Sequence, residues 1–237
     1  MNVVSFSGGK DSTAMLLMML EKGIPVDRIV CIDTTKEFPQ MYAHIREVQK
    51  MVNPLKIEVI KIDFDYWFGE YTRTKGKYTG IKGYGFPDFH NRWCTALKRE
   101  AFRKTVYGGT RVKDIKNSDI VEFHGIAFDE PKRVHNRGAY KYVNIRRPLF
   151  EWGITENQAL RYCYSKGLNW SGLYEKFKRV SCWMCPLSRI GELRTLYNDF
   201  PELWQKLREM DKKSCRKFRM DYSVDDLTGR FIKENLS

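Results

Sequence analysis

The first 62 residues alternate between short apolar runs and amphipathic stretches, and this alternation constrains the fold more than any other feature of the chain. Residues 3–6, 28–33 and 57–62 are predicted to be buried strands, because each is a short apolar run bounded by turn residues. Residues 13–20 and 41–52 lie between them and are predicted to be helices. This order predicts an α/β fold, a parallel twisted sheet with right-handed crossovers and helices on both faces.

The alternation stops at residue 63. Residues 63–91 are rich in Gly, Tyr, Phe and basic residues, which predicts an insertion or a lid loop. A helix over 92–104 and a fourth strand over 119–125 are expected next. We therefore predict an α/β domain over residues 1–150 and a mainly helical, Cys-containing subdomain over 151–237.

Two local signals mark helix starts in the predicted subdomain. Thr155 is followed three residues later by Gln158, a capping box that opens a helix through Lys166. Pro201 suits the first turn of a helix that reaches Cys215. Four tryptophans are expected to pack the core of this subdomain: Trp152, Trp170, Trp183 and Trp204.

The turn after the first strand predicts an anion site. Parallel sheets bind ligands at the carboxyl ends of their strands, and this turn lies there, directly before a helix whose N-terminus carries positive dipole. Two glycines allow successive backbone N–H groups to face one point, and side chains add further donors. The predicted ligand-binding residues are Ser7, Gly8, Gly9, Lys10, Asp11 and Ser12.

The order of these residues is neither a Walker P-loop nor a Gly-x-Gly-x-x-Gly fingerprint. Ser7–Ser12 resembles the PP-loop, Ser-Gly-Gly-x-Asp-Ser, of the N-type ATP pyrophosphatases and the phosphoadenosine phosphosulfate (PAPS) reductases. The resemblance implies that the loop holds the phosphates of an adenine nucleotide, with Lys10 and Asp11 as the catalytic candidates and Mg²⁺ as the usual companion ion. An ordinary glycine-rich strand–helix turn is the alternative.

The resemblance to the PAPS reductase family continues in order to about residue 190. Residues 33–39 resemble its Asp-Thr-Gly-x-Glu-Phe-Pro segment, with Thr35 where Gly is usual, and this implies that Asp33 borders the nucleotide. A cap on the following turn is the alternative for Asp33. Further similar segments lie at residues 92–99, 125–133, 148–152 and 181–186.

Basic residues outnumber acidic ones in the middle of the chain. Residues 71–147 carry 18 basic and 7 acidic side chains, whereas residues 1–70 carry 8 and 10. This excess predicts an anionic partner, a nucleotide or a nucleic acid, and a solvated basic face is the alternative. By resemblance, Lys98 and Arg133 are the residues that clamp phosphate or sulfate, with Glu130 pairing with and orienting the arginine.

The cysteines predict a metal site. Cys182 and Cys185 form a Cys-x-x-Cys pair in basic surroundings that favour thiolates, and resemblance to the family makes Cys94 the third ligand. The fourth ligand is left open between three residues: His90, Cys163 and Cys215. Three cysteines with His90 would suit Zn²⁺, and four cysteines would suit Zn²⁺ or a [4Fe–4S] cluster. Three unconnected buried thiols are the alternative.

Two departures from the family bear on activity. Trp93 stands where cluster-bearing reductases have the first of two tandem cysteines. No cysteine follows Cys215, whereas the reductases use a nucleophilic cysteine in a C-terminal tail, so reduction of PAPS by the usual route is not expected.

Three functional hypotheses follow. The first is a PAPS reductase-like PP-loop enzyme that binds ATP or a sulfated adenine nucleotide and acts in sulfur transfer or by adenylation with pyrophosphate release. The second is a nucleic-acid-directed factor of the tRNA-thiolating or DNA-sulfur-modifying kind, which contacts nucleic acid through residues 71–147. The third is a non-catalytic nucleotide-binding subunit with structural zinc.

Composition limits where such a protein works. No apolar run approaches the roughly 20 residues of a membrane helix, and no signal peptide is recognised, so we expect a cytoplasmic protein without a membrane partner. Six cysteines in 237 residues do not predict a disulfide framework. Homo-oligomerisation is left open.

Overall fold

The computed structural model describes residues 1–110, 115, 118–135 and 143–236. The chain folds into two compact units, each assembled from separated stretches. The first, the sheet unit, comprises Met1–Asp33, Pro39–Lys61 and Lys98–Leu173. The second, the cysteine unit, comprises Thr34–Phe38, Ile62–Leu97 and Tyr174–Ser237. These stretches do not coincide with residues 1–150 and 151–237, and a domain boundary after residue 150 stays a prediction.

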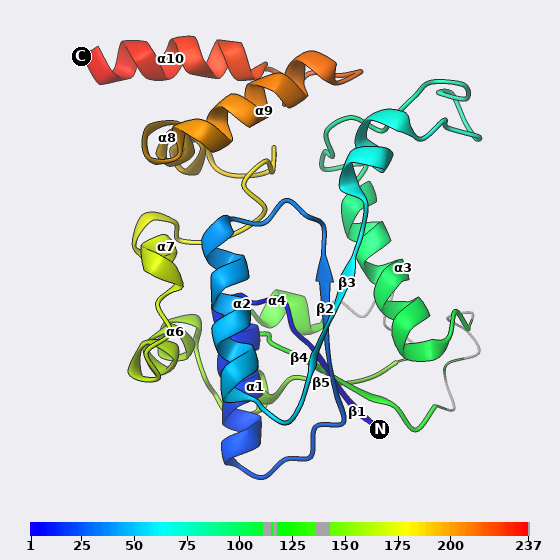
Figure 1. Ribbon diagram of the computed structural model, residues 1–237, viewed down its shortest axis with the longest axis vertical. Coiled ribbons are helices and arrows are strands. Elements are labelled where there is room, and N and C mark those ends of the chain that lie inside the picture. The colour runs from blue at the N-terminus through cyan, green and yellow to red at the C-terminus, as the bar shows by residue number, and fades with distance from the viewer. Residues whose placement is uncertain (111–114, 116–117, 136–142, 237) are drawn as a thin grey trace. The chain divides into compact units, whose positions relative to one another are not determined.

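The sheet unit contains a five-stranded sheet in the order β3-β2-β1-β4-β5, and all four neighbouring pairs are parallel (Figure 1). The strands are β1 (Asn2–Ser5), β2 (Arg28–Asp33), β3 (Ile57–Lys61), β4 (Val121–His124) and β5 (Asn144–Arg146). The predicted α/β fold with a parallel sheet is confirmed. Sequence reasoning missed β5, because three residues with one apolar side chain give no strand pattern.

Helices of the sheet unit follow the strands. They are α1 (Lys10–Glu21), α2 (Pro39–Met51), most of α3 (Trp93–Tyr107), α4 (Pro131–His135), α5 (Pro148–Glu151), α6 (Glu156–Ser165) and the 3₁₀ turn η4 (Trp170–Gly172). The predicted capping box opens α6: the Thr155 hydroxyl accepts from the Gln158 amide, and the Gln158 side chain accepts from the Thr155 amide. Thr155 therefore starts α6 as its sequence predicts.

The core of the sheet unit is apolar on both sides of the sheet. On one side, Val106 and Phe102 of α3 pack against Val3 of β1 and Val30 of β2. Helix α1 is apolar around most of its circumference because it also packs against α6, so its residues 14–17 are all buried.

The cysteine unit is mainly helical in its C-terminal part. Its helices are the π-helix η1 (Tyr66–Glu70), most of α7 (Leu173–Lys176), α8 (Ile190–Asp199), α9 (Pro201–Lys213) and α10 (Val224–Leu236). Pro201 occupies the first turn of α9, as predicted. Trp204 of α9 stacks near Phe231 of α10, with ring centroids 5.7 Å apart. In the part of the chain that the structure describes, no helix is both long and apolar enough to cross a membrane.

The strand order places one loop at the position where such sheets bind ligands. The chain adds β2 and β3 on one side of β1, and then returns to add β4 and β5 on the other side. The carboxyl end of β1 therefore lies at the topological switch point, where a crevice opens in α/β sheets of this kind. The loop Ser7–Gly9 connects this end of β1 to α1.

Candidate functional site

The loop after β1 has a backbone that only glycine fits at its second position. Gly8 has φ = +75°, and a Cβ there would lie 2.8 Å from the Met41 sulfur. Gly9 is the N-cap of α1, and no side chain caps the helix at this residue. Because the first-turn amides of any helix lack intrahelical acceptors, the start of α1 presents N–H groups and the positive end of the helix dipole.

Two aromatic side chains brace this loop within the sheet unit. Trp170 donates its indole N–H to the Gly8 carbonyl at 2.8 Å. The His44 ring stacks on Trp170 with centroids 4.2 Å apart, and its Nε2 lies 3.0 Å from the Thr13 hydroxyl. Burial lowers the pKa of His44 to about 4, so this ring is neutral at pH 7. The brace is built from buried, uncharged contacts.

The loop after β4 presses against the start of α1. A Cβ at Gly125 would lie 2.7 Å from both the Cα and the amide nitrogen of Ser12. These are backbone atoms and cannot move aside as a flexible side chain can. Gly125 therefore allows the loop after β4 to approach the first turn of α1 at the switch point.

The two serines of the loop hydrogen bond within it. Their hydroxyls lie 3.0 Å apart, the Ser12 hydroxyl accepts from the Ser7 amide at 3.2 Å, and it donates to the Gly9 carbonyl at 3.0 Å. The sequence predicts both hydroxyls as ligand donors. In this structure they close the turn on itself, and their part in ligand binding stays a prediction.

Lys10 lies between two carboxylates. Its Nζ is 3.1 Å from Asp11 Oδ2 and 2.8 Å from Glu156 Oε2 of α6. Burial acts to lower the pKa of Lys10, but Asp11 and Glu156 outweigh it, so the pKa is raised and the ammonium is kept. Burial raises the pKa of Asp11 to about 6, against the opposing effect of Lys10. Asp11 Oδ1 is buried and has no hydrogen-bond partner among the described residues.

This arrangement carries a net negative charge when both carboxylates are ionised. One ammonium faces two carboxylates, and the charge of Glu130, also near Asp11, is offset by its own partner Arg133. A bare polyphosphate would meet repulsion here, whereas a polyphosphate bound to a divalent cation would not. The unsatisfied oxygen of Asp11 fits such a cation, since Mg²⁺ prefers carboxylate ligands.

Asp33 differs in burial and in hydrogen-bond partners from Lys98 and Arg133, the predicted phosphate-clamping residues. Asp33, at the end of β2, is buried and accepts a hydrogen bond from the Tyr42 hydroxyl at 3.0 Å. Arg133 is exposed, and its Nη1 donates to both carboxylate oxygens of Glu130 at 2.8 and 2.6 Å, so the expected pairing of these two residues is confirmed. Lys98 is half-buried on α3. The binding roles of all three predicted residues stay predictions.

Part of the predicted basic region cannot be placed. Residues 111–114, 116–117 and 136–142 fall within the stretch 71–147 and lie outside the described residues.

All three predicted metal-ligating cysteines belong to the cysteine unit. Cys94 and Cys185 lie close enough for their charges to interact, and burial, followed by this interaction, raises the pKa of Cys185. Arg179 and Arg92 act to lower the pKa of Cys185, as basic surroundings are expected to, but burial outweighs them.

Cys182 has polar partners in the segment at residues 34–37. Its sulfur donates to Glu37 Oε1 at 3.3 Å and lies 3.5 Å from the Thr34 hydroxyl. Within residues 1–110, 115, 118–135 and 143–236, no three His, Cys, Asp or Glu side chains gather as a metal site. The arrangement of the cysteines therefore does not fit Zn²⁺ or a cluster as it stands, and a metal at these residues stays a prediction.

The three residues considered for a fourth ligand are dispersed. Cys163 is buried in the sheet unit, where its thiol lies 3.5 Å from the Lys10 carbonyl. His90 and Cys215 are exposed in the cysteine unit, and Cys215 lies 3.6 Å from Arg73 Nη2. Cys31 is a core residue of β2, as its position in a strand predicts.

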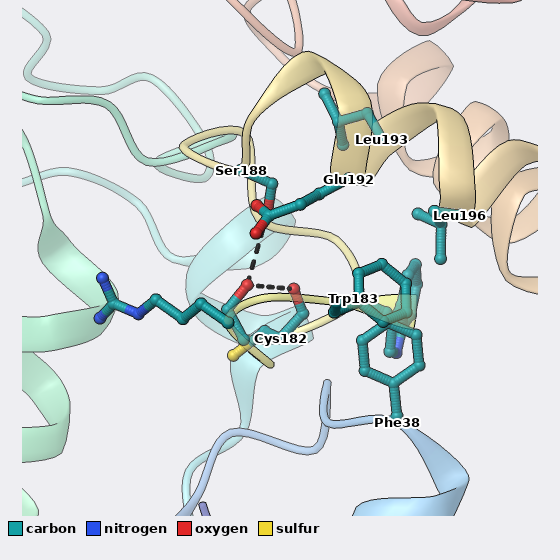
Figure 2. Close-up of a pocket in the computed structure, with 10 residues that line it drawn as sticks. Phe38, Cys182, Trp183, Ser188, Glu192, Leu193 and Leu196 are labelled. Carbon is teal, nitrogen blue, oxygen red and sulfur yellow. Dashed lines mark hydrogen bonds between the residues drawn. The ribbon is translucent and has the colours of Figure 1, made fainter. Parts of the chain in front are cut away.

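A small pocket adjoins Cys182 in the cysteine unit. In Figure 2 its apolar side is formed by residues such as Phe38 and Leu196, and Ser188 and Glu192 lie across from Cys182. The amide of Trp183 donates to the Lys36 carbonyl at 3.1 Å, which ties the Cys-x-x-Cys turn to residues 34–38. This pocket was not foreseen from the sequence.

Sequence reasoning also missed the residues that support the loop. The sequence predicts Trp170 in the core of a C-terminal subdomain, whereas the residue belongs to the sheet unit and donates a hydrogen bond to the Gly8 carbonyl. No sequence motif indicates that His44 would contact Thr13 or that Glu156 would pair with Lys10. The signal for Trp170 was faint: it follows Asn169, whose side chain caps the η4 turn.

Comparisons with known proteins give the chain a family and several relatives. The family model described as "Phosphoadenosine phosphosulfate reductase domain" matches residues 1–188. Two uncharacterized proteins of Methanocaldococcus jannaschii are similar, at 30% identity over 89% of this chain and 42% of the relative, and at 27% over 96% and 50%. An uncharacterized nin region protein of Escherichia phage lambda is 30% identical over 60% of this chain and 53% of its own length.

The chain spans about half the length of these curated relatives. Among solved structures, a U34-tRNA thiolase from Methanococcus maripaludis with its [4Fe–4S] cluster is similar with a TM-score of 0.41 and 15% identity, over 89% of this chain and 70% of that one. We draw no functional conclusion from a likeness of that size. The family match covers the loop after β1, the segment at residues 33–39 and the Cys-x-x-Cys turn, and the chain belongs to the phosphoadenosine phosphosulfate reductase domain family.

Proposed function

We propose that the protein is a PP-loop enzyme that binds an adenine nucleotide at the start of α1 and acts in sulfur transfer or by adenylation with release of pyrophosphate. One observation carries the proposal: a helix N-terminus without a side-chain cap follows β1 at the switch point of a parallel sheet. Membership of a family whose members bind adenine nucleotides supports it.

The charges favour ATP with Mg²⁺ over a metal-free sulfated nucleotide. Lys10 is matched by two carboxylates, so the loop offers no excess positive side-chain charge to a bare anion. Asp11 would hold Mg²⁺ through its unsatisfied oxygen, and the ion would offset negative charge on the phosphates.

The chain's own groups supply the rest of the reaction. The first-turn amides of α1 would hold the β- and γ-phosphates while an oxygen of the acceptor attacks the α-phosphate. A bond forms between that oxygen and the α-phosphorus, and the bond to the bridging oxygen breaks, so pyrophosphate leaves with the electron pair. Lys10 and the amides stabilise this departing charge, which is worth most in a site shielded from water.

Calorimetry with ATP in the presence and absence of Mg²⁺, together with an assay for pyrophosphate release, tests the proposal. We expect binding that depends on Mg²⁺ and is lost in Lys10→Ala. Lys50→Ala on α2 is the matched control, because Lys50 is an exposed lysine paired with Glu47 and is remote in sequence from the loop. Unchanged binding in Lys10→Ala would remove Lys10 from the mechanism.

The same titrations separate the rival functions. Tight ATP binding without any turnover would favour a nucleotide-binding subunit. Binding of a sulfated adenine nucleotide that is tighter than that of ATP and indifferent to Mg²⁺ would overturn the preference for ATP. A nucleic-acid-directed function is favoured by a separate observation in the cysteine unit.

A further inference from the structure

Residues 71–84 of the cysteine unit form a two-stranded ribbon. Thr72 and Lys82 make an antiparallel bridge, and Arg73 exchanges backbone hydrogen bonds with Ile81 and Gly80 at 3.0 and 2.9 Å. Figure 1 draws this ribbon within the cyan-to-green segment between β3 and α3. Residues 74–82 are all exposed, so the ribbon ends in a solvated tip.

The ribbon is positively charged without local compensation. Its 14 residues include four basic side chains and no acidic one. Lys75, Lys77 and Lys82 are exposed, and no ion pair holds them among the described residues. Lys176 and Arg208, elsewhere in the cysteine unit, pair with aspartates, whereas no carboxylate lies among residues 71–84 to pair with these lysines.

Flat side chains are stacked along the ribbon. The Arg73 guanidinium lies 5.1 Å from the ring centroid of Tyr78 and 5.2 Å from that of Tyr84. The stack continues from Tyr84 to Tyr71, with centroids 5.3 Å apart and planes 25° apart, and to Trp67 at 6.1 Å and 15°. Tyr78, at the tip, is 51% exposed.

The base of the ribbon is fixed. Gly83 packs so closely against η1 that a Cβ there would lie 2.1 Å from the Phe68 carbonyl oxygen. Arg73 donates its Nε–H to the Gly83 carbonyl at 2.8 Å, and its Nη2 lies 3.6 Å from the Cys215 sulfur. A preformed surface of this kind loses little conformational entropy when it binds a ligand.

We propose that the ribbon 71–84 binds a single-stranded stretch of nucleic acid, with phosphates on Lys75, Lys77 and Lys82 and a base stacked at Tyr78. Aromatic faces beside lysines are how proteins bind unpaired strands, because every base has a face to stack and every nucleotide a phosphate. An acidic protein would use the arginine fork, but the Nε and Nη2 of Arg73 already face Gly83 and Cys215. A duplex would leave the tyrosine without an accessible base.

Fluorescence anisotropy with labelled oligouridylate, oligothymidylate and duplex DNA of equal length tests this proposal. We expect either single strand to bind more tightly than the duplex, with affinity that falls steeply between about 50 and 200 mM salt. Tyr78→Ala should weaken single-strand binding by about tenfold. Binding of the duplex as tight as of the single strands, or no effect of Tyr78→Ala, would overturn the proposal.

A charge-matched pair of variants isolates the lysines. Lys75→Gln/Lys77→Gln should reduce the slope of log affinity against log salt by about 1.4, the value for two phosphate contacts on a single strand. Lys56→Gln/Lys206→Gln removes the same charge from exposed positions outside the ribbon and should leave the slope unchanged. Equal effects of the two pairs would mean that net charge alone binds the strand.

Two further measurements distinguish nucleic acid from an acidic protein as the partner and separate strand binding from ATP binding. Displacement of the oligonucleotide by polyglutamate at the same charge concentration would indicate an acidic protein ligand and overturn the proposal. Lys10→Ala should keep full single-strand binding, because the ribbon does not depend on the nucleotide loop. Failure of ATP binding would therefore leave this inference standing, and failure of strand binding would leave the proposed nucleotide chemistry standing.

Discussion

The loop after β1 and the Cys-x-x-Cys turn were both singled out by short motifs, yet the structure organises them to different degrees. The loop is fixed by residues distant in sequence: Met41, Gly125 and Trp170 all contact it or leave it just enough room. The cysteines predicted as ligands are in one unit, but Cys182 faces Glu37, and no three ligand side chains gather in the part of the chain that the structure describes.

The two kinds of site place different structural requirements on the fold. An anion loop uses the backbone of consecutive residues, so a strand, a turn and a helix N-terminus in the right order are nearly sufficient. A metal site needs side chains from separate segments to converge within bonding distance. The first requirement is visible in a sequence, and the second depends on tertiary placement.

The largest expected effect is at the contact that fixes the loop. Gly125→Ala should destabilise the protein by about 4 kcal/mol and abolish ATP binding, because the new Cβ would meet the backbone of Ser12 at 2.7 Å. Urea unfolding and calorimetry measure the two effects. Gly23→Ala is the control: nothing lies within 4 Å of a Cβ there, so only the strain of its positive φ, about 1 kcal/mol, is expected.

The next prediction concerns acid, where two groups at the loop act in opposite directions. The pKa of His44 is about 4 in the folded protein and 6.5 in the unfolded chain, so the unfolded chain takes up the proton first and stability falls as the pH drops through this window. The pKa of Asp11 is about 6 in the folded protein and 3.8 in the unfolded chain, so stability rises as the pH drops from 6 to 4. Each contribution is about 3 kcal/mol, and they nearly cancel.

Asp11→Asn breaks this balance. Relative to the unsubstituted protein, the variant should lose about 3 kcal/mol of unfolding free energy between pH 6.5 and pH 4, because only His44 remains. Urea unfolding at pH 7, 5.5 and 4 checks this, and His44→Asn should shift the difference in the opposite direction. Parallel pH profiles for Asp11→Asn and the unsubstituted protein would contradict the prediction.

Much of the sheet unit could be predicted, because its strands are apolar runs and its capping box is local. The supports of the loop could not. Glu156 opens α6, and its proximity to Lys10, 146 positions earlier, arises from the packing of α6 on α1. Trp170 is one of six tryptophans, and nothing in the sequence sets it apart from the others. Its hydrogen bond to the Gly8 carbonyl depends on a turn in which Trp170 and Ser171 both have positive φ.

A smaller effect tests that brace. Trp170→Phe should keep most of the stacking on His44 and remove the shorter hydrogen bond to the Gly8 carbonyl, which keeps only the Thr13 hydroxyl at 3.5 Å, at a cost of about 1 kcal/mol. We expect weaker ATP binding as well, because the loop backbone loses its support. Trp204→Phe, in the cysteine unit, also removes an indole hydrogen bond, here to Thr228, and should lower stability without changing ATP affinity.

The smallest effect lies beside the cysteine site, at the residue where the chain departs from the family's glycine. Thr35 has φ = +61°, a left-handed conformation that is strained for a β-branched residue. Thr35→Gly should therefore stabilise the protein by about 1 kcal/mol, since relief of the strain exceeds the added entropy of the unfolded chain. Urea unfolding measures the gain, and Thr74→Gly, at an exposed threonine without positive φ, should give a loss instead. A loss in Thr35→Gly would show that the threonine side chain makes contacts worth more than the strain, and that this departure stabilises the segment carrying Thr34 and Glu37.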